Sequence, residues 1–511
     1  MNQTNNNPSI YHSKTGQFML LSVFAIGVLL IFLLNLSAMA QTTATSGVHS
    51  QFDHFIARDR TRLMDGAEEF CFFGLDAPEL LQNQHQVKPD FSNRFPDEYE
   101  IRDALTTIRQ MGGLATRCYT FPIHRSGDSI PVYITGIRQY NEDAFRTFDR
   151  VLLLANQIGI RIIVPIIDGH DFYYVGGIKE FAAFRHKSAE QFWTDPELRQ
   201  DFKNLLWDII NRTNTLTGVQ YKNDPAILAW QLGNELDCFP GKPKRDPKKW
   251  DPILATWSLE MASYIHSIDT NHLVMEGRAG RWEEVAANPA IDILSRHYYV
   301  YFSGEKNLYK WCRSDKQLAN GYGKVFIVDE FGLGATTNLL DLMNEIITSG
   351  TSGGLLWRLR SHRRDGGFYS HEDAGSYKSY HWTGFPPGDF QDETHLLGLL
   401  RAKAFAIRHA VEEPLPRPSA PFLLPIRKHA ISWQGSVGAS SYILQRCETG
   451  SDNWTTIAAH ITDDREPPLY LDQHTPTGKK LSYRVIACNS TGQSPPSNVV
   501  NADDTTPHSS P

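Results

Sequence analysis

The 511-residue chain is poor in cysteine, with six in all, and it lacks the spacings of common metal sites. So few cysteines cannot form a disulfide framework, and the hydrophobic cores must therefore stabilise the fold. Cys238 and Cys312 both fall in expected loops and could pair, a question that the sequence leaves open. Because there is no C-x-x-C and no H-E-x-x-H, we expect no structural zinc site and no zincin-type centre.

The chain also has only a small excess of charge of one sign. The chain has 50 Lys and Arg against 57 Asp and Glu, a net charge of −7, and no long basic run. This balance argues against nucleic acid as the main partner and favours a neutral or mixed-charge substrate. A hydrophobic content of 41% is typical of a globular protein, and the length predicts two domains.

The N-terminus holds a long apolar run, residues 18–34, with Lys14 as the only Lys or Arg before it. Ala38 and Ala40 then flank Met39, which predicts an export signal (residues 1–40) cut after Ala40, and hence a secreted or periplasmic protein. The alternative is an uncleaved membrane anchor, since a run of this length nearly spans a bilayer. After cleavage we expect no stable membrane insertion.

Short apolar runs alternate with helical patterns from about Phe70 to His409. The expected strands are residues 70–76, 114–121, 161–168, 227–235, 273–278, 292–299, 324–331 and 354–359. The best helix signal is residues 194–214, where Asp195 can cap and Pro196 fits the first turn. Near-continuous apolar strands with helices between them predict an α/β fold, a (β/α)8 TIM barrel, over residues 41–411. A doubly wound open sheet is the alternative, but no G-x-G-x-x-G follows the first strand.

The C-terminal part has a different pattern. Four prolines in residues 412–421 predict a stiff linker over residues 412–419. Period-two alternation beyond it predicts a small all-β immunoglobulin-like sandwich over residues 420–503, with a tail at 504–511. The spacing of Trp433, Tyr442 and Tyr483 resembles a fibronectin type III module. We favour a spacer with Trp433 in its core over a sugar-binding module, because buried aromatics are the commoner use.

Two glutamates end strands that face each other. In such a barrel the carboxyl ends of the strands face the active site. Glu235 ends the fourth expected strand and Glu330 the seventh, so their tips should meet across the mouth. Two carboxyl groups about 5 Å apart suit a retaining glycosidase. A single glutamate at a strand end more often caps a helix or forms an ion pair, but two that face each other favour a catalytic role.

Other strand ends carry side chains that fit this chemistry. Arg117 can hold a carboxylate ionised, and Tyr299 could donate a hydrogen bond to Glu330. Arg117 and Tyr299 should thus lower the pKa of Glu330, whereas burial and like charge should raise the pKa of Glu235. His297 and Trp357 also end strands, and Trp357 offers a flat apolar face for a pyranose ring. Taken singly, these residues fit a structural ion pair or core packing; taken together they favour a site.

The stretch from Phe192 to Leu236 resembles glycoside hydrolase family 5, and most closely its β-mannanases. The similarity spans roughly residues 52–409 and rests on strand-end residues: Arg117, Asn234, Glu235, His297, Tyr298, Tyr299, Glu330 and Trp357. The resemblance implies that Glu235 is the acid/base, that Glu330 is the nucleophile, and that Asn234 holds the 2-hydroxyl of the sugar.

The resemblance further implies a secreted retaining β-glycoside hydrolase, a mannan endo-1,4-β-mannosidase that works by double displacement without a cofactor. The expected partner is a β-linked polysaccharide or oligosaccharide, and we expect a monomer. The alternatives are a β-glucanase or cellulase, an exo-acting β-mannosidase, or a carbohydrate-binding protein without turnover.

The sequence departs from the β-mannanase pattern in several places. Leu236 replaces the usual proline, Asp76 stands where asparagine is usual, and Asp168 and His170 occur in an unusual end of the third strand. The segment after Trp357 is rich in charge, with Arg358, Arg360, His362, Arg363 and Arg364. We expect a solvated network with Asp365, Glu372 and Asp373, and contact with a decorated or acidic glycan is the alternative.

Overall fold

The computed structural model describes residues 50–87, 90–125, 131–170, 175–238, 246–280, 282–371, 373, 379–384 and 392–502. The expected export signal (residues 1–40) and the tail at 504–511 lie outside the described residues, as does Glu372. Among the described helices, none has both the length and the hydropathy needed to cross a membrane.

Eight parallel strands form the central sheet, with every expected strand present. Their order around the sheet is β4-β15-β14-β13-β12-β11-β10-β7. The strands are β4 (Phe72–Leu75), β7 (Ala115–Arg117), β10 (Arg161–Asp168), β11 (Ile227–Asn234), β12 (Leu273–Met275), β13 (Ile293–Tyr299), β14 (Val325–Gly332) and β15 (Gly353–Leu356). Several expected strands end too late in the sequence, because their last residues leave the ladder to form the mouth.

The first and last strands of this order close the sheet into a barrel. The backbone N–H of Ala77 donates to the carbonyl of Arg117 at 2.9 Å, just beyond β4 and β7. The Thr116 hydroxyl donates to the carbonyl of Leu75 at 2.6 Å. These bonds join the edges that an open sheet would leave unpaired, so the doubly wound alternative is wrong.

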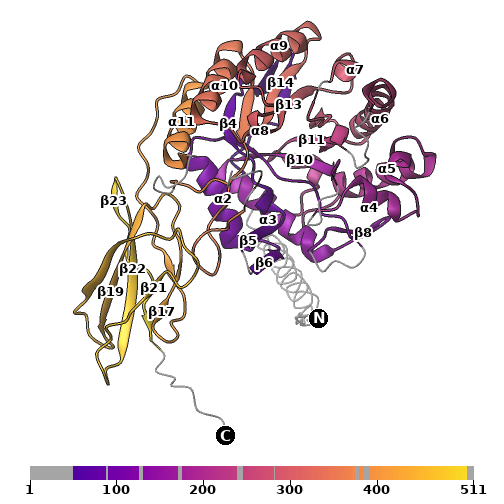
Figure 1. The fold of residues 1–511 in the computed structure, drawn as a ribbon. Coiled ribbons are helices and arrows are strands. Elements are labelled where there is room, and N and C mark those ends of the chain that lie inside the picture. The colour runs from indigo at the N-terminus through magenta and orange to yellow at the C-terminus, as the bar shows by residue number, and fades with distance from the viewer. Residues whose placement is uncertain are drawn as a thin grey trace, which may run out of the picture. The chain divides into compact units, whose positions relative to one another are not determined.

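Helices connect the strands and surround them in Figure 1. They are α2 (Glu98–Gln110), α3 (Glu142–Ile158), α4 (Ile178–Ala183), α5 (Pro196–Ile210), α6 (Pro247–Ile268), α7 (Glu283–Ala286), α8 (Val300–Ser303), α9 (Leu308–Gly321), α10 (Thr336–Ser349) and α11 (Glu393–Ala406). Helix α5 begins as expected, with Pro196 in its first turn and the Asp195 carboxylate accepting from the N–H groups of Glu197 and Leu198. The alternation of strand and helix is that of a (β/α)8 barrel.

A small N-terminal sheet closes the amino end of the barrel. It consists of β1 (Ile56–Asp59), β2 (Arg62–Asp65) and β3 (Glu68–Glu69). Ile56 and Leu63 share a buried cluster with residues from the starts of the barrel strands, such as Phe72 and Val325. With this end sealed by apolar side chains, the polar chemistry is confined to the opposite, carboxyl end.

The C-terminal β unit (residues 420–502) contains paired antiparallel strands. They are β16 (Phe422–Leu423), β17 (Ala430–Ile431), β18 (Trp433–Gln434), β19 (Ser441–Glu448), β20 (Thr455–Ile461), β21 (Tyr470–Leu471), β22 (Leu481–Asn489), β23 (Gly492–Gln493) and β24 (Val500–Asn501). Trp433 is fully buried in its core, as the spacer interpretation predicts. The likeness to fibronectin type III stays a prediction, and so do the domain boundaries.

The expectation of a solvated loop after Trp357 is wrong in most respects. Arg358 does pair with Asp373 at 2.8 Å, but the two side chains are only 3% and 8% exposed. Arg360 is fully buried beside Glu79. The loop is thus packed inside the protein, where each charge needs a partner.

The same loop contacts the C-terminal β unit. His362 lies between Asp103 of α2 (Nδ1 to Oδ1, 2.8 Å) and Asp463 of the β unit (Nε2 to Oδ2, 3.1 Å). Arg363 forms an ion pair with Glu466. The carbonyl of Arg364 accepts from the Gln434 side chain at 3.2 Å. These contacts pair buried charges across the two parts, so the β unit is more than a tethered spacer.

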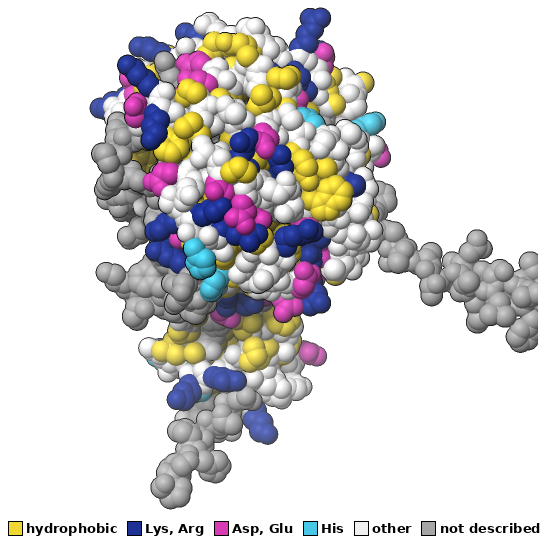
Figure 2. All heavy atoms as spheres, turned by 90° about the vertical axis from the view of Figure 1, so that its right-hand side faces the viewer, with side chains coloured by type: hydrophobic (Ala, Val, Ile, Leu, Met, Phe, Trp, Pro, Cys, Tyr) yellow, Lys and Arg dark blue, Asp and Glu magenta, His cyan; other side chains and the backbone are white. Residues whose placement is uncertain are grey.

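Charged side chains of both signs are interspersed on the face of the molecule in Figure 2. This face has no continuous basic surface of the kind that binds nucleic acid.

We expect replacement of His362 by glutamine to destabilise the protein in a pH-dependent manner. Burial lowers the pKa of His362, but Asp103 and Asp463 outweigh it and raise the pKa to about 10. Protonation of His362 stabilises the fold because its pKa is higher in the folded protein than in the unfolded chain, where it is about 6.5. This stabilisation is complete below the unfolded pKa and is lost as pH rises through about 10. His362→Gln should therefore lower the free energy of unfolding by about 2 kcal/mol near pH 6. The difference in melting temperature between wild type and variant should be largest there and should shrink toward pH 10.

The control is His395→Gln, which removes a histidine that is 62% exposed beside Asp392. It should have little effect at any pH. A difference for His362→Gln that does not change between pH 6 and pH 10 would contradict the charged state of His362.

Candidate active site

The predicted site residues all lie at the carboxyl ends of barrel strands. Arg117 ends β7, Asn234 ends β11 and is followed by Glu235, and Trp357 directly follows β15. The other three are in the last residues of their strands: His297 and Tyr299 in β13, and Glu330 in β14. Parallel strands put these ends at one mouth of the barrel, which is why residues far apart in sequence meet there.

Glu330 is held by three side chains. Arg117 Nη1 donates to Oε1 at 2.7 Å, and the Tyr299 hydroxyl donates to Oε2 at 2.5 Å. His297 Nδ1 lies 3.2 Å from Oε2. The side chain of Glu330 is only 5% exposed, so these contacts replace most of the hydration of its carboxylate.

Glu235 is held by two histidines. His297 Nδ1 is 2.6 Å from Glu235 Oε1, and His170 Nε2 is in hydrogen-bond contact with Oε2. The backbone of Glu235 is left-handed, with φ of 45°. Such a conformation costs about 1 kcal/mol for a side chain other than glycine, and it turns the carboxylate toward the mouth rather than along the strand.

Neighbouring backbone keeps Glu235 in this conformation. The N–H of Gly169 donates to the carbonyl of Asn234 at 2.7 Å, and the N–H of Leu236 donates to the carbonyl of Gly277 at 3.2 Å. A Cβ at Gly169 would lie 2.1 Å from the carbonyl oxygen of Glu235, so only glycine fits there. A proline in place of Leu236 would have no N–H to donate, which gives this departure a structural role.

The two glutamates lie at the spacing that the sequence predicts. Oxygens of Glu235 and Glu330 and a ring nitrogen of His297 all lie within 4.8 Å of one another. The Glu235 side chain is 18% exposed and is therefore accessible to a ligand in the mouth. Carboxyl groups so close fit attack by one carboxylate and proton transfer by the other, without room for a water between them.

The expected pKa values of the two glutamates are wrong in direction. Burial would raise the pKa of Glu235, but the hydrogen bonds from His170 and His297 outweigh it, so the pKa is lowered. The pKa of Glu330 is raised, chiefly because burial exceeds the combined effect of His297 and Arg117. Sequence reasoning missed this result because it placed Arg117 and Tyr299 beside Glu330 and assigned no histidine to Glu235.

The histidines carry the positive charge beside Glu235. Burial lowers the pKa of His170, but its bond to Glu235 and the charge of Asp168 outweigh it and raise the pKa to about 9. The pKa of His297 is also raised well above its usual range, because Glu330 and Asp329 outweigh burial. Both rings thus favour the imidazolium form at neutral pH.

Asn234 and Trp357 join the site through Arg117 and Tyr119. Arg117 Nη2 donates to Asn234 Oδ1 at 2.7 Å, and Asn234 Nδ2 donates to the Tyr119 hydroxyl at 2.9 Å. The ring centroids of Tyr119 and Trp357 are 5.7 Å apart. Trp357 Nε1 donates to Asp373 at 3.2 Å, which fixes the plane of the indole.

Sequence reasoning did not assign two further buried polar residues, Asp329 and Asp76, to this site. Asp329 accepts from Gln231 at 2.8 Å and from Ser295 at 2.9 Å. Asp76 is buried with its Oδ1 3.9 Å from Arg117, and its pKa is raised well above the usual range by burial and then by Glu330. A carboxylate inside a buried strand, as in "VFIVDEF", is the signal that could have identified Asp329.

Glu235, His297 and Glu330 would also reach a single metal ion. Each of the two carboxylates already accepts hydrogen bonds from cationic side chains, so an ion would have to displace them. The donor set therefore fits a hydrogen-bonded pair of carboxylates better than a metal centre. Cys238 and Cys312 are both free, so the pairing that the sequence left open does not form here.

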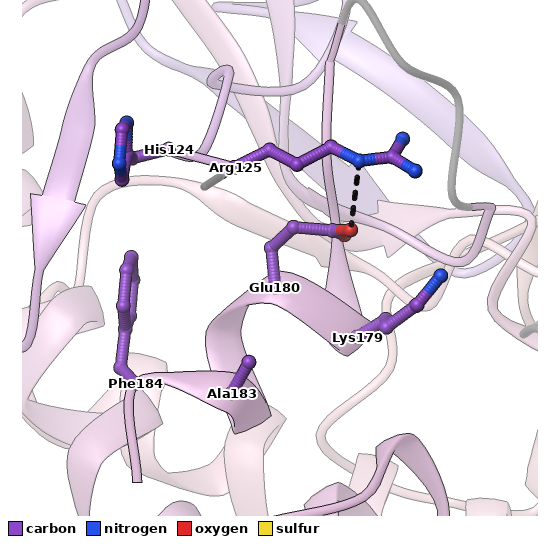
Figure 3. A pocket seen from close by; sticks show the side chains of 6 residues that line it. All are labelled: His124, Arg125, Lys179, Glu180, Ala183 and Phe184. Carbon is purple, nitrogen blue, oxygen red and sulfur yellow. Dashed lines mark ion pairs between the residues drawn. The ribbon is translucent and has the colours of Figure 1, made fainter. Parts of the chain in front are cut away.

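A pocket of about 370 Å³ lies between the segments after β7 and β10, lined by His124, Arg125, Lys179, Glu180, Ala183 and Phe184. Figure 3 shows the Arg125 side chain above Glu180, and the rings of His124 and Phe184 together at the left. The Nε atom of Arg125 lies 4.0 Å from Oε1 of Glu180. None of the predicted site residues lines it. A Cβ at Gly177, just before α4, would meet the carbonyl of His170 at 2.5 Å, which brings this segment beside the site.

Comparison with known proteins agrees with the geometry. Residues 162–347, which include Asn234, Glu235, His297, Tyr299 and Glu330, match the family described as "GH family 5 beta-mannosidase-like". A similar protein is mannan endo-1,4-beta-mannosidase 1 of Arabidopsis thaliana, 32% identical over 231 residues, or 45% of this chain and 52% of that protein. The chain thus spans about half the length of this relative. These matches show that the chain is similar to glycoside hydrolase family 5 and to its mannanases.

Solved structures share the fold. The endo-1,4-beta-mannanase of Rhizomucor miehei superimposes with a TM-score of 0.51 at 20% identity, covering 60% of this chain and 90% of that one. The endo-beta-1,4-mannanase of Thermotoga petrophila gives a TM-score of 0.54 at 18% identity, covering 86% and 98%. At these identities the likeness concerns the fold alone, and it supports the (β/α)8 barrel.

We expect removal of the His170 ring to raise the pKa of Glu235. His170→Ala takes away a cationic hydrogen-bond partner of a carboxylate whose pKa that partner lowers. Carbon NMR of glutamate-labelled protein should show Glu235 titrating at higher pH in the variant than in the wild type. The control His124→Ala removes an exposed histidine of the pocket in Figure 3 and should leave the titration unchanged. An equal or lower pKa in His170→Ala would contradict the assigned cause.

Proposed function

We propose that the chain is a retaining β-glycoside hydrolase that acts within β-1,4-linked mannan-type polysaccharides. The observation that carries the proposal is the spacing of Glu235 and Glu330, whose oxygens lie within 4.8 Å beside His297. Two carboxylates at this distance at the mouth of the barrel suit double displacement at an anomeric carbon.

In the proposed reaction Glu330 attacks the anomeric carbon and the glycosidic C–O bond breaks, with the leaving oxygen taking a proton from Glu235. Water then attacks the glycosyl-enzyme, gives its proton to Glu235 and releases the sugar with retained configuration. Arg117 and Tyr299 hold Glu330 in the direction of attack through bonds of 2.7 and 2.5 Å. Both steps are proton transfer and carboxylate displacement, so the proposal needs no cofactor.

The proton for the first step comes from the hydrogen bond between His170 and Glu235. In the free protein the pKa of Glu235 is lowered and that of His170 is raised, so this proton lies on the imidazole. As negative charge develops on the leaving oxygen, the proton moves from His170 to Glu235 and from Glu235 to that oxygen. His170 therefore acts through Glu235, and the basic limb of activity should follow the pKa of His170, about 9.

Asn234 and Trp357 complete the proposed sugar site. Asn234 is fixed by Arg117 and Tyr119, and in this proposal it binds the 2-hydroxyl, as the resemblance implies. Trp357 offers an indole face whose edge is tied to Asp373. Stacking of a pyranose ring on an aromatic face buries apolar C–H groups and leaves the hydroxyls for polar partners.

Mannan is favoured over glucan by the relatives, which are named as mannan endo-1,4-beta-mannosidases. Product analysis on linear mannan, galactomannan, glucomannan and a β-1,4-glucan tests this choice. Internal cleavage of mannans with slower release from glucan supports the proposal. Release of mannose alone would favour an exo-acting enzyme, and binding without any product would favour a carbohydrate-binding protein.

We also propose export with cleavage after Ala40, on the strength of the apolar run at residues 18–34. N-terminal sequencing of protein recovered outside the cytoplasm should begin at Gln41. A protein that stays membrane-bound with its N-terminus intact would favour the anchor. Action as a monomer is likewise a prediction, to be checked by sedimentation.

Replacing Glu330 by alanine should reduce turnover by at least about 10³-fold while leaving the fold intact, because the attacking group is gone. The rate on mannan and on an activated aryl β-mannoside should fall alike. Added azide should not restore a product of retained configuration. A variant that keeps more than a few per cent of the wild-type rate would overturn the assignment of the nucleophile.

Replacing Glu235 by alanine should have an effect that depends on the leaving group. Activated aryl glycosides need little protonation, so their first step should survive and the glycosyl-enzyme should accumulate, as mass spectrometry would detect. Turnover of mannan should fall far more than the first step on the aryl substrate. Equal losses in both measurements would argue against an acid/base role.

A further inference from the structure

A short helix beside the site presents two aromatic side chains to solvent. Helix α8 (Val300–Ser303) directly follows Tyr299 at the carboxyl end of β13. The Ser303 hydroxyl donates to the carbonyl of Tyr299 at 2.7 Å, and the N–H of Tyr301 donates to the carbonyl of Leu333 at 3.2 Å. Leu333 directly follows β14, so α8 is tied to the two strands that carry Tyr299 and Glu330.

The side chains of Tyr301 and Phe302 are 50% and 67% exposed. Among the large hydrophobic residues of the described chain, Phe302 is the most exposed aromatic one, and these two are neighbours in sequence. Their ring centroids lie 5.1 Å apart at an interplanar angle of 87°. A single exposed apolar residue is ordinary, but a joined pair of aromatic rings at the mouth of a barrel indicates a binding surface.

This surface is continuous with the candidate active site. The ring centroids of Phe302 and Tyr299 lie 5.7 Å apart, edge to face. The hydroxyl of Tyr299 in turn donates to Glu330 at 2.5 Å. Phe302 is thus one ring away from the residue that holds Glu330, on the solvent side.

We propose that Tyr301 and Phe302 form a stacking platform for a pyranose ring of the substrate chain, outside the subsite at Glu330. This inference rests on the proposed function. It assigns Tyr301 and Phe302 to sugar units of the substrate that lie beyond the bond that is cleaved. The C–H face of a pyranose covers an aromatic ring while its hydroxyls stay in water, which suits rings that are half exposed. A platform outside the cleavage point is useful only to a substrate of several sugar units, so it fits action within a chain.

The test compares β-1,4-mannohexaose with β-1,4-mannotriose on the full-length enzyme. In Phe302→Ala and Tyr301→Ala, kcat/KM for the hexaose should fall about tenfold relative to the triose, mainly through KM. Phe302→Trp, which retains an aromatic face, should restore most of the wild-type ratio. The control Tyr322→Ala removes a ring that is 43% exposed at the end of α9, before β14 begins and so at the opposite end of the barrel.

An equal loss on both oligosaccharides would overturn the platform, because it would mean that Phe302 only supports Tyr299. An unchanged ratio would also overturn it, as would a wild-type dimer in sedimentation that Phe302→Ala abolishes, since the rings would then meet a second copy. Failure of the proposed function looks different: the wild type itself would hydrolyse neither oligosaccharide, and both proposals would fall together.

Discussion

Two glutamates with oxygens within 4.8 Å of each other, one buried and one partly buried, can share one site only if positive charge lies between and around them. His297 supplies that charge from the centre, 2.6 Å from Glu235 and 3.2 Å from Glu330. Arg117 supports Glu330 from one side, and His170 supports Glu235 from the other. Removing one member would leave an uncompensated charge in a partly buried site, which is more costly than loss of a surface ion pair.

The barrel makes this arrangement possible. Its amino end is sealed by the apolar residues of β1 and β2, so polar side chains concentrate at the carboxyl end. There Glu235 has a left-handed backbone conformation, and Gly169 permits it by its close approach to the Glu235 carbonyl. The strands around Glu235 offset this local strain, so the fold imposes a backbone conformation that glutamate does not favour by itself.

The charged loop after Trp357 links the site to the C-terminal β unit. Its first residue, Arg358, pairs with Asp373, which also accepts from the Trp357 indole. Farther along, His362 joins Asp103 of the barrel to Asp463 of the β unit. The loop therefore connects the indole face of the candidate site with a buried ionic contact between the two parts.

The strand pattern could be read from the sequence because buried parallel strands are apolar on both faces, as in residues 161–168 and 227–234. The facing glutamates followed from counting those strands, since the position of a strand in the ring fixes what its tip faces. The cap of α5 was equally local: Asp195 and Pro196 are sufficient to start a helix.

The partners of each charge were decided only by the tertiary structure. His170 is 65 residues from Glu235 in sequence, and no spacing rule assigns it to that carboxylate rather than to Asp168. For the same reason, sequence reasoning predicted the wrong directions for the pKa values of both glutamates and a solvated loop where His362 is buried. A side chain's type and strand are local properties, whereas burial and ionic partners depend on what the folded chain brings within a few ångströms.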